Sequence, residues 1–323
     1  MEKLIKSEVE IDQKEDTKTN GIVSAPVLKE QYTAAYLKNG VTRGITYQIK
    51  MLTWVAWKLM RKDDMNDWLL ATEMRNARGF HDLVLKYKIN NKDEATPQYM
   101  YRFVQIKLKM SKKTKISMTT LTSMQKNERQ FSLLYLFKAY LGIITGKESI
   151  KPEQIKDLII FTNRGLGESL RFLIPVKEDE IIGFEGKGKQ YRIDTNMVQT
   201  EPCIMMALRQ NCRSDDRIIL GFLKKVVFMV DQPPEPEMEE LITKEMSKVF
   251  HSPQIFYNDL YKNITEWFLI YEDGGKAPYL TKQDIIHYLT NMHKVLLGTQ
   301  KGKLLFIADS SSELTDKLQR LSL

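Results

Sequence analysis

The chain has few of the residues that build zinc centres or disulfide frameworks, with 2 cysteines and 4 histidines among 323 residues. Cys203 and Cys212 do not combine with the scattered histidines into a zinc-ligand spacing, which argues against a zinc finger and a disulfide-stabilised domain. The chain also lacks an apolar run of about twenty residues, so we expect no membrane span. Its first residues, MEKLIKSEVEIDQKEDTKTN, contain no apolar block typical of a secretory signal. We therefore expect a cytoplasmic or nuclear protein that is not secreted.

Basic residues outnumber acidic ones, 49 to 41, which gives a net charge of +8. This excess weakly favours a polyanionic partner such as nucleic acid. The position of the lysines is more informative, because the segment KLKMSKKTK at residues 107–115 contains no acidic residue. We predict that four of its lysines, together with Gln48 of the preceding helix, contact nucleic acid: Lys109, Lys112, Lys113 and Lys115.

The length of the chain suggests two domains, or one domain with a large extension. Composition and periodicity divide it into a disordered or loosely packed arm (1–38), an α/β domain (39–165), a mixed connecting region (166–230) and a helical C-terminal region (231–323).

Within residues 39–165 the pattern predicts a helix, three strands, a helical region and a fourth strand. The helix starts near Gly44 or Thr46, the strands cover 67–74, 80–87 and 101–110, the helical region covers 118–144, and the last strand lies in IKDLIIFTNRGL. This order indicates an α/β fold with a mixed central sheet flanked by helices, followed by a mostly helical extension.

Polar side chains interrupt strands that otherwise have the apolar pattern of covered strands. If the second and third strands pair, Asp82, Gln105 and Lys107 meet at one edge of the sheet, where Glu73 and Gln48 can join them. Burying such groups costs several kcal/mol unless they are paired or coordinate a cation. Carboxylate and amide oxygens suit a hard divalent ion such as Mg²⁺ or Mn²⁺. An ammonium beside that ion could orient or deprotonate a water.

A simpler interpretation exists for each of these residues. Asp82 and Lys107 can form a cross-strand ion pair without catalytic meaning. Glu73 can be a charge at a strand end, and Gln48 a satisfied amide of the core. Strand alternation puts His81 on the face opposite Asp82, where we expect no catalytic role.

The order of the residues carries more information than any one of them. They follow the pattern Gly44-x-x-Tyr47-Gln48 on a helix, then Glu73, Asp82 and Gln105-x-Lys107 on successive strands. This pattern resembles the PD-(D/E)xK, or restriction-endonuclease-like, nuclease superfamily, especially its Mrr-like and antiphage-effector branch. Segments such as GITYQIKML and FVQIKLK are also similar to arthropod proteins that carry this domain. The resemblance covers about residues 40 to 165.

The resemblance implies Asp82 as the central metal ligand, Gln105 as a weaker one, Lys107 as the catalytic lysine, and Glu73 or Gln48 at the remaining position. It implies an endonuclease that uses Mg²⁺ or Mn²⁺ to hydrolyse phosphodiester bonds in double-stranded DNA, with RNA as an alternative, and that works as a homodimer or higher oligomer. Because Gln105 replaces an acid, the site should hold Mg²⁺ less tightly. The competing hypothesis is a catalytically inactive module of the same fold that binds nucleic acid or a protein partner.

Overall fold

The structure is a computed structural model. It describes residues 35–65, 67–74, 77, 79–89, 98–109, 115–125, 129–146, 149–200, 202–212, 214–270 and 278–298. Residues 1–34 of the predicted arm lie outside these ranges, and residues 35–38 belong to the first helix. Among the described helices, none is long and apolar enough to cross a membrane.

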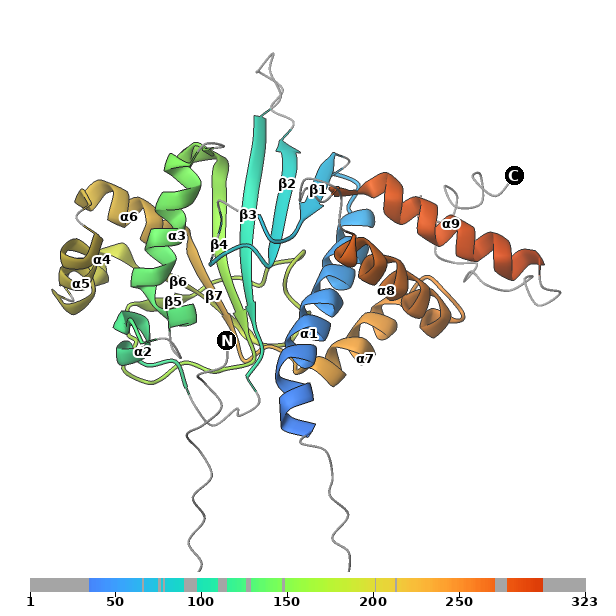
Figure 1. Ribbon diagram of the computed structural model, residues 1–323, viewed down its shortest axis with the longest axis horizontal. Helices are drawn as coiled ribbons and strands as arrows, with labels where there is room; N and C mark the ends of the chain where they lie inside the picture. The colour runs from blue at the N-terminus through green and yellow to red at the C-terminus, as the bar shows by residue number, and fades with distance from the viewer. Residues whose placement is uncertain are drawn as a thin grey trace, which may run out of the picture.

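Helices and strands are interspersed along the described chain (Figure 1). The α-helices are α1 (Ala35–Met60), α2 (Met118–Thr122), α3 (Leu133–Thr145), α4 (Thr195–Thr200), α5 (Pro202–Cys212), α6 (Asp216–Lys225), α7 (Glu235–Met246), α8 (Pro253–Leu269) and α9 (Lys282–Gly298). The strands are β1 (Trp68–Ala71), β2 (Leu83–Ile89), β3 (Gln98–Lys107), β4 (Ile155–Thr162), β5 (Leu173–Pro175), β6 (Lys189–Ile193), β7 (Val226–Val230) and β8 (Leu280–Thr281).

The strands of the described chain form one open, mixed sheet in the order β5-β6-β7-β4-β3-β2-β1-β8. The central strands β3, β4 and β7 are parallel, and the outer neighbours pair antiparallel. The parallel strands are rich in β-branched and aromatic residues because helices cover both of their faces. The predicted α/β fold with a mixed central sheet is therefore confirmed.

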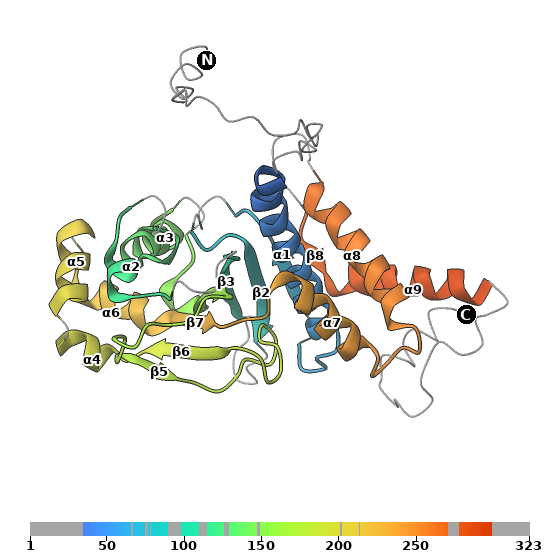
Figure 2. The same cartoon turned by 90° about the horizontal axis from the view of Figure 1, so that it is seen from below.

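Two groups of helices cover the two faces of the sheet (Figure 2). One group is α1 with α7, α8 and α9, and the other is α2 to α6. A hydrophobic core lies on each face of the sheet, and side chains of β3 alternate between the two. Val104 and Ile106 pack in the core that includes α1, and Phe103 packs in the core that includes α3. Both faces of β3 are therefore covered near its end, and the strand end itself is a place where polar side chains can gather.

The predicted order of helix, three strands, helical region and strand is confirmed, with shifted boundaries. Helix α1 begins at Ala35, earlier than the predicted start, and continues through Gly44. The connecting region 166–230 contributes β5, β6 and β7 to the same sheet. Its helices α4, α5 and α6 were not predicted, because short apolar runs such as CIMMAL do not distinguish a helix from a strand.

The last helix, α9, begins with a capping box between Thr281 and Asp284. The backbone N–H of Thr281 donates to Asp284 Oδ2 at 2.8 Å, and the N–H of Asp284 donates to Thr281 Oγ1 at 3.3 Å. Each side chain thus satisfies a backbone donor that the first turn leaves unpaired. The same turn starts directly from β8, so this cap fixes α9 to the edge of the sheet.

Candidate metal-binding site

Three strand ends bring the predicted residues to one edge of the sheet. Strands β1 and β2 pair antiparallel with Ala71 opposite Val84, and β2 and β3 pair antiparallel with Leu83 opposite Val104. The end of β1, the start of β2 and the end of β3 therefore coincide. Asp82 precedes this start by one residue, and Lys107 is the last residue of β3.

Asp82 is buried, with 5% of its surface exposed, and one of its two carboxylate oxygens is saturated with donors. Its Oδ2 accepts hydrogen bonds from Gln105 Nε2, from the backbone N–H of Ile106 at 2.7 Å and from Lys107 Nζ at 3.4 Å. Such contacts compensate the cost of removing a carboxylate from water. Its other oxygen, Oδ1, lies 3.3 Å from His81 Nδ1.

Glu73 reaches the same place from the other side. Its backbone N–H donates to the carbonyl of His81 at 2.8 Å, and its Oε2 lies 3.0 Å from His81 Nδ1. Glu73 has a φ of 53°, in the left-handed region that non-glycine residues adopt at a cost of about 1–2 kcal/mol. The hydrogen bond to His81 lowers the pKa of the Glu73 carboxyl, and the same bond raises the pKa of the His81 imidazole.

Gln48 connects helix α1 to this edge. Its Nε2 donates to the carbonyl of Asp82 at 2.7 Å and lies 3.5 Å from Glu73 Oε1. Gln48 is buried, with 9% of its surface exposed. This position agrees with the simpler interpretation, in which Gln48 is a hydrogen-bonded amide of the core. It holds the chain around Asp82 in place, and its contact with nucleic acid stays a prediction.

Two of the predicted ligands lie together with His81, and the predicted role of Gln105 as a ligand stays a prediction. Glu73, His81 and Asp82 each offer a ligand atom, and these three atoms lie within 4.8 Å of one another. Atoms bound about 2.1 Å from one cation lie at most about 4.2 Å apart, so a small movement of these side chains would bring all three into reach of one ion. Gln105 turns its Nε2 toward Asp82, so the amide orients the carboxylate at this contact. The donor set of two carboxylates and one imidazole therefore fits a divalent ion.

The expected position of His81 was wrong. Strand alternation placed it opposite Asp82, but β2 begins only at Leu83, and both residues belong to the turn before it. Gly79, with a φ of 105°, makes this turn, and there the alternating rule does not apply. The sequence offered one signal, a glycine three residues ahead of the acidic residue, which indicates a turn at the start of the strand.

Only part of the lysine cluster lies among the described residues. Lys109 follows β3, its Nζ lies 6.0 Å from the centre of the Phe131 ring, and its backbone pairs with the Asn163 side chain. Lys115 is exposed, with its Nζ 4.0 Å from Glu168. Lys112 and Lys113 lie outside the described residues. The predicted contact of these lysines with a phosphate backbone stays a prediction.

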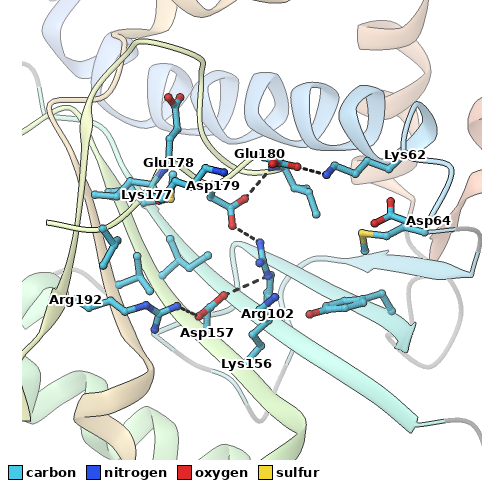
Figure 3. Close-up of a pocket in the computed structure, with 18 of the residues that line it drawn as sticks. Lys62, Asp64, Arg102, Lys156, Asp157, Lys177, Glu178, Asp179, Glu180 and Arg192 are labelled. Carbon is cyan, nitrogen blue, oxygen red and sulfur yellow. Dashed lines mark hydrogen bonds and ion pairs between the residues drawn. The ribbon is translucent and has the colours of Figure 1, made fainter. Parts of the chain in front are cut away.

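A cavity of about 780 Å³ lies against one face of the sheet (Figure 3). At its centre the Arg102 guanidinium contacts two carboxylates, Asp179 at 2.6 Å and Asp157 at 3.3 Å, and Asp157 also binds Arg192. Arg102 precedes Lys107 by five residues in β3 (107 − 102), or about 16 Å along the strand. This distance separates the cavity from the Asp82 cluster. The charges at the centre of the cavity are paired with one another.

No protein-family model matches the chain, and a search of curated proteins finds no match either.

Proposed function

We propose that the protein is a metal-dependent nuclease with a restriction-endonuclease-like core that hydrolyses phosphodiester bonds in double-stranded DNA. The single observation that supports it most is the Lys107 ammonium 3.4 Å from the buried carboxylate of Asp82, which in turn lies beside Glu73. Carboxylates and one lysine at the end of paired strands are the parts that the sequence resemblance requires.

Each side chain has a stated role in this proposal. Asp82 and Glu73 bind a divalent cation, which supplies charge neutralisation at the phosphate and a more acidic water. The lowered pKa of Glu73 keeps its carboxylate ionised at neutral pH. Lys107, with 28% of its side chain exposed, is accessible to a water or a phosphate oxygen. Gln105 and the backbone N–H of Ile106 orient Asp82 through its Oδ2.

The substrate follows from charge. The net charge of +8 and the lysines after β3 support binding to a phosphate backbone on the side of the sheet edge where Lys107 lies. Cleavage of both strands of a duplex suits a homodimer, in which each protomer supplies one site.

The test is incubation of the full chain with supercoiled plasmid and Mg²⁺ or Mn²⁺. Asp82→Ala and Lys107→Ala should each lower the cleavage rate by about 10²–10⁴-fold, the range for loss of a group that acts on the reacting water. Asp64→Ala is the matched control, because Asp64 lies in the turn after α1, outside the cluster, and should leave the rate unchanged. Equal cleavage by all four proteins would assign the activity to a contaminant and refute the proposal.

The second candidate function is a non-catalytic module that binds nucleic acid. It is favoured by the amide of Gln105 at a position where a third acid would strengthen metal binding. Titration separates the two functions: salt-sensitive DNA binding without affinity for Mg²⁺ or Mn²⁺ supports the module, whereas metal binding that disappears in Asp82→Ala supports the nuclease.

A further inference from the structure

We propose that His81 is a direct metal ligand and that it makes the site prefer a first-row transition ion, Mn²⁺ in our test, over Mg²⁺. The inference rests on the metal site of the proposed function, but it does not require that the protein cleaves DNA.

The first argument is which oxygen of Asp82 is left for a cation. Its Oδ2 is occupied by donors from Gln105, Ile106 and Lys107. Three donors on one oxygen leave little room for a cation there, since each of them brings a partial or full positive charge. The remaining oxygen, Oδ1, faces His81 Nδ1 at 3.3 Å. A cation bound through Oδ1 would therefore have an imidazole nitrogen as its neighbour.

The second argument is that His81 stands between two carboxylates. Its Nδ1 lies 3.0 Å from Glu73 Oε2 on one side and 3.3 Å from Asp82 Oδ1 on the other. The imidazole nitrogen therefore faces a carboxylate oxygen on each side. A divalent cation would bind between these groups, since one ligand atom from each of Glu73, His81 and Asp82 lies within 4.8 Å of the others.

The third argument is that the segment carrying His81 is held rigidly on both sides. Phe80 before it is fully buried in the core beneath α3, and Asp82 after it is fixed through its carbonyl by Gln48 at 2.7 Å. The His81 carbonyl itself accepts the Glu73 N–H at 2.8 Å. At Gly79 a side chain would approach Ala139 and Tyr135 to 3.0 Å, so the turn is packed against α3 as well. Such support keeps the imidazole in its place at little entropic cost.

The chemistry of the donors then determines the ion. Mg²⁺ prefers an all-oxygen octahedral shell and keeps several waters, whereas imidazole suits first-row transition ions. Among divalent ions, affinity for mixed nitrogen and oxygen sites rises from Mn²⁺ through the later members of the row. An Asp, Glu and His set should therefore bind Mn²⁺ at least about ten-fold more tightly than Mg²⁺.

The test uses the full chain after metal removal, with Mn²⁺ as the probe and no DNA present. Electron paramagnetic resonance measures free Mn²⁺ and so gives the affinity for Mn²⁺. Displacement of bound Mn²⁺ by added Mg²⁺ gives the affinity for Mg²⁺. Electron spin echo modulation detects a nitrogen bound to Mn²⁺. The wild type should show imidazole nitrogen coupling. His81→Ala should lose that coupling and at least about ten-fold of Mn²⁺ affinity, while its Mg²⁺ affinity changes by less than about three-fold. His251→Ala, at an exposed histidine before α8, should behave like the wild type.

The outcomes separate this inference from the proposed function. Absence of nitrogen coupling in the wild type, which needs no variant to fold, overturns the inference, as does coupling that survives in His81→Ala. An Asp82-dependent nuclease without nitrogen coupling would leave the proposed function standing and refute the role of His81. Nitrogen coupling that depends on His81, without plasmid cleavage, would support the inference and refute the nuclease. A wild type that binds no Mn²⁺ refutes the inference together with the metal site.

Discussion

The buried ion network beneath the cavity allows a stability prediction with a worked magnitude. Asp157 is 2% exposed and neutralises two guanidinium groups, since its Oδ2 lies 3.3 Å from Arg102 and its Oδ1 binds Arg192. Asp157→Asn removes this charge. Loss of one member of a buried ion pair costs about 3–5 kcal/mol because its partner remains buried without compensation.

We expect the lower end of that range, about 3 kcal/mol, for two reasons visible in the structure. Arg102 keeps a second carboxylate, Asp179 at 2.6 Å, and Arg192 is 35% exposed at its side chain. In a chain of this size each kcal/mol lowers the melting temperature by about 2–4 °C, so the shift should be about 6–12 °C.

The assay is thermal unfolding followed by circular dichroism at pH 7, with Glu178→Gln as control. Glu178 also lines the cavity, but it is exposed and accepts the Gly186 N–H at 3.2 Å, so its change should lower the melting temperature by less than about 2 °C. A double-mutant cycle of Arg102→Met with Asp157→Asn should give a coupling energy of about 1–3 kcal/mol. Equal melting temperatures for Asp157→Asn and the control would refute the reasoning.

Three further predictions concern other parts of the molecule. Burial alone would raise the pKa of the Asp179 carboxyl, but the neighbouring guanidinium and two backbone N–H groups lower it below its ordinary 3.8. Its stabilisation is therefore present above that pH and lost as the pH falls through the folded-state value. Asp179→Asn should lower the urea midpoint of unfolding at pH 7, and its difference from the wild type should shrink as the pH falls below 3.8. Gly188→Ala should lower the free energy of unfolding by at least about 2 kcal/mol, because φ is 71° and the new Cβ would lie 2.8 Å from a β7 carbonyl oxygen. Gly186→Ala, with a φ of 67° and open space around the new Cβ, should lower it by about half as much. Urea titration measures both changes. Thr281→Val removes the hydroxyl that accepts the Asp284 N–H and should destabilise the first turn of α9 by about 1 kcal/mol. Hydrogen exchange in this turn should become faster, and unchanged exchange would contradict the role of the cap.

Much of the site could be predicted because antiparallel register is local information. Asp82 and Gln105 come together since β2 and β3 pair with Leu83 opposite Val104, and a short connection between the two strands leaves few alternatives. Lys107 follows Gln105 on the same face, so its approach to Asp82 comes with the same register.

The rest depended on geometry that periodicity does not contain. The position of His81 was wrongly predicted because the strand begins at Leu83, two residues after His81. The orientation of Gln105 follows from hydrogen-bond chemistry, since the carboxylate of Asp82 only accepts and the amide must turn its nitrogen toward it.

Long-range pairing was the hardest part of the fold to predict. Strand β8 joins β1 through Leu280 opposite Leu70, across more than half the chain, and two residues are too short to show any alternation. The ion network of Arg102, Asp157 and Asp179 likewise joins two strands and a distant connection, and no local pattern marks its members as partners.

The central claim is that Asp82, Glu73 and His81 bind one divalent cation beside Lys107, and the most direct test is anomalous diffraction from crystals of the full chain soaked in Mn²⁺. The account predicts one anomalous peak within about 2.3 Å of Asp82 Oδ1, Glu73 Oε2 and His81 Nδ1. Crystals that show no peak there at millimolar Mn²⁺, with His81 Nδ1 still 3.0 Å from Glu73 Oε2 and 3.3 Å from Asp82 Oδ1, would contradict it.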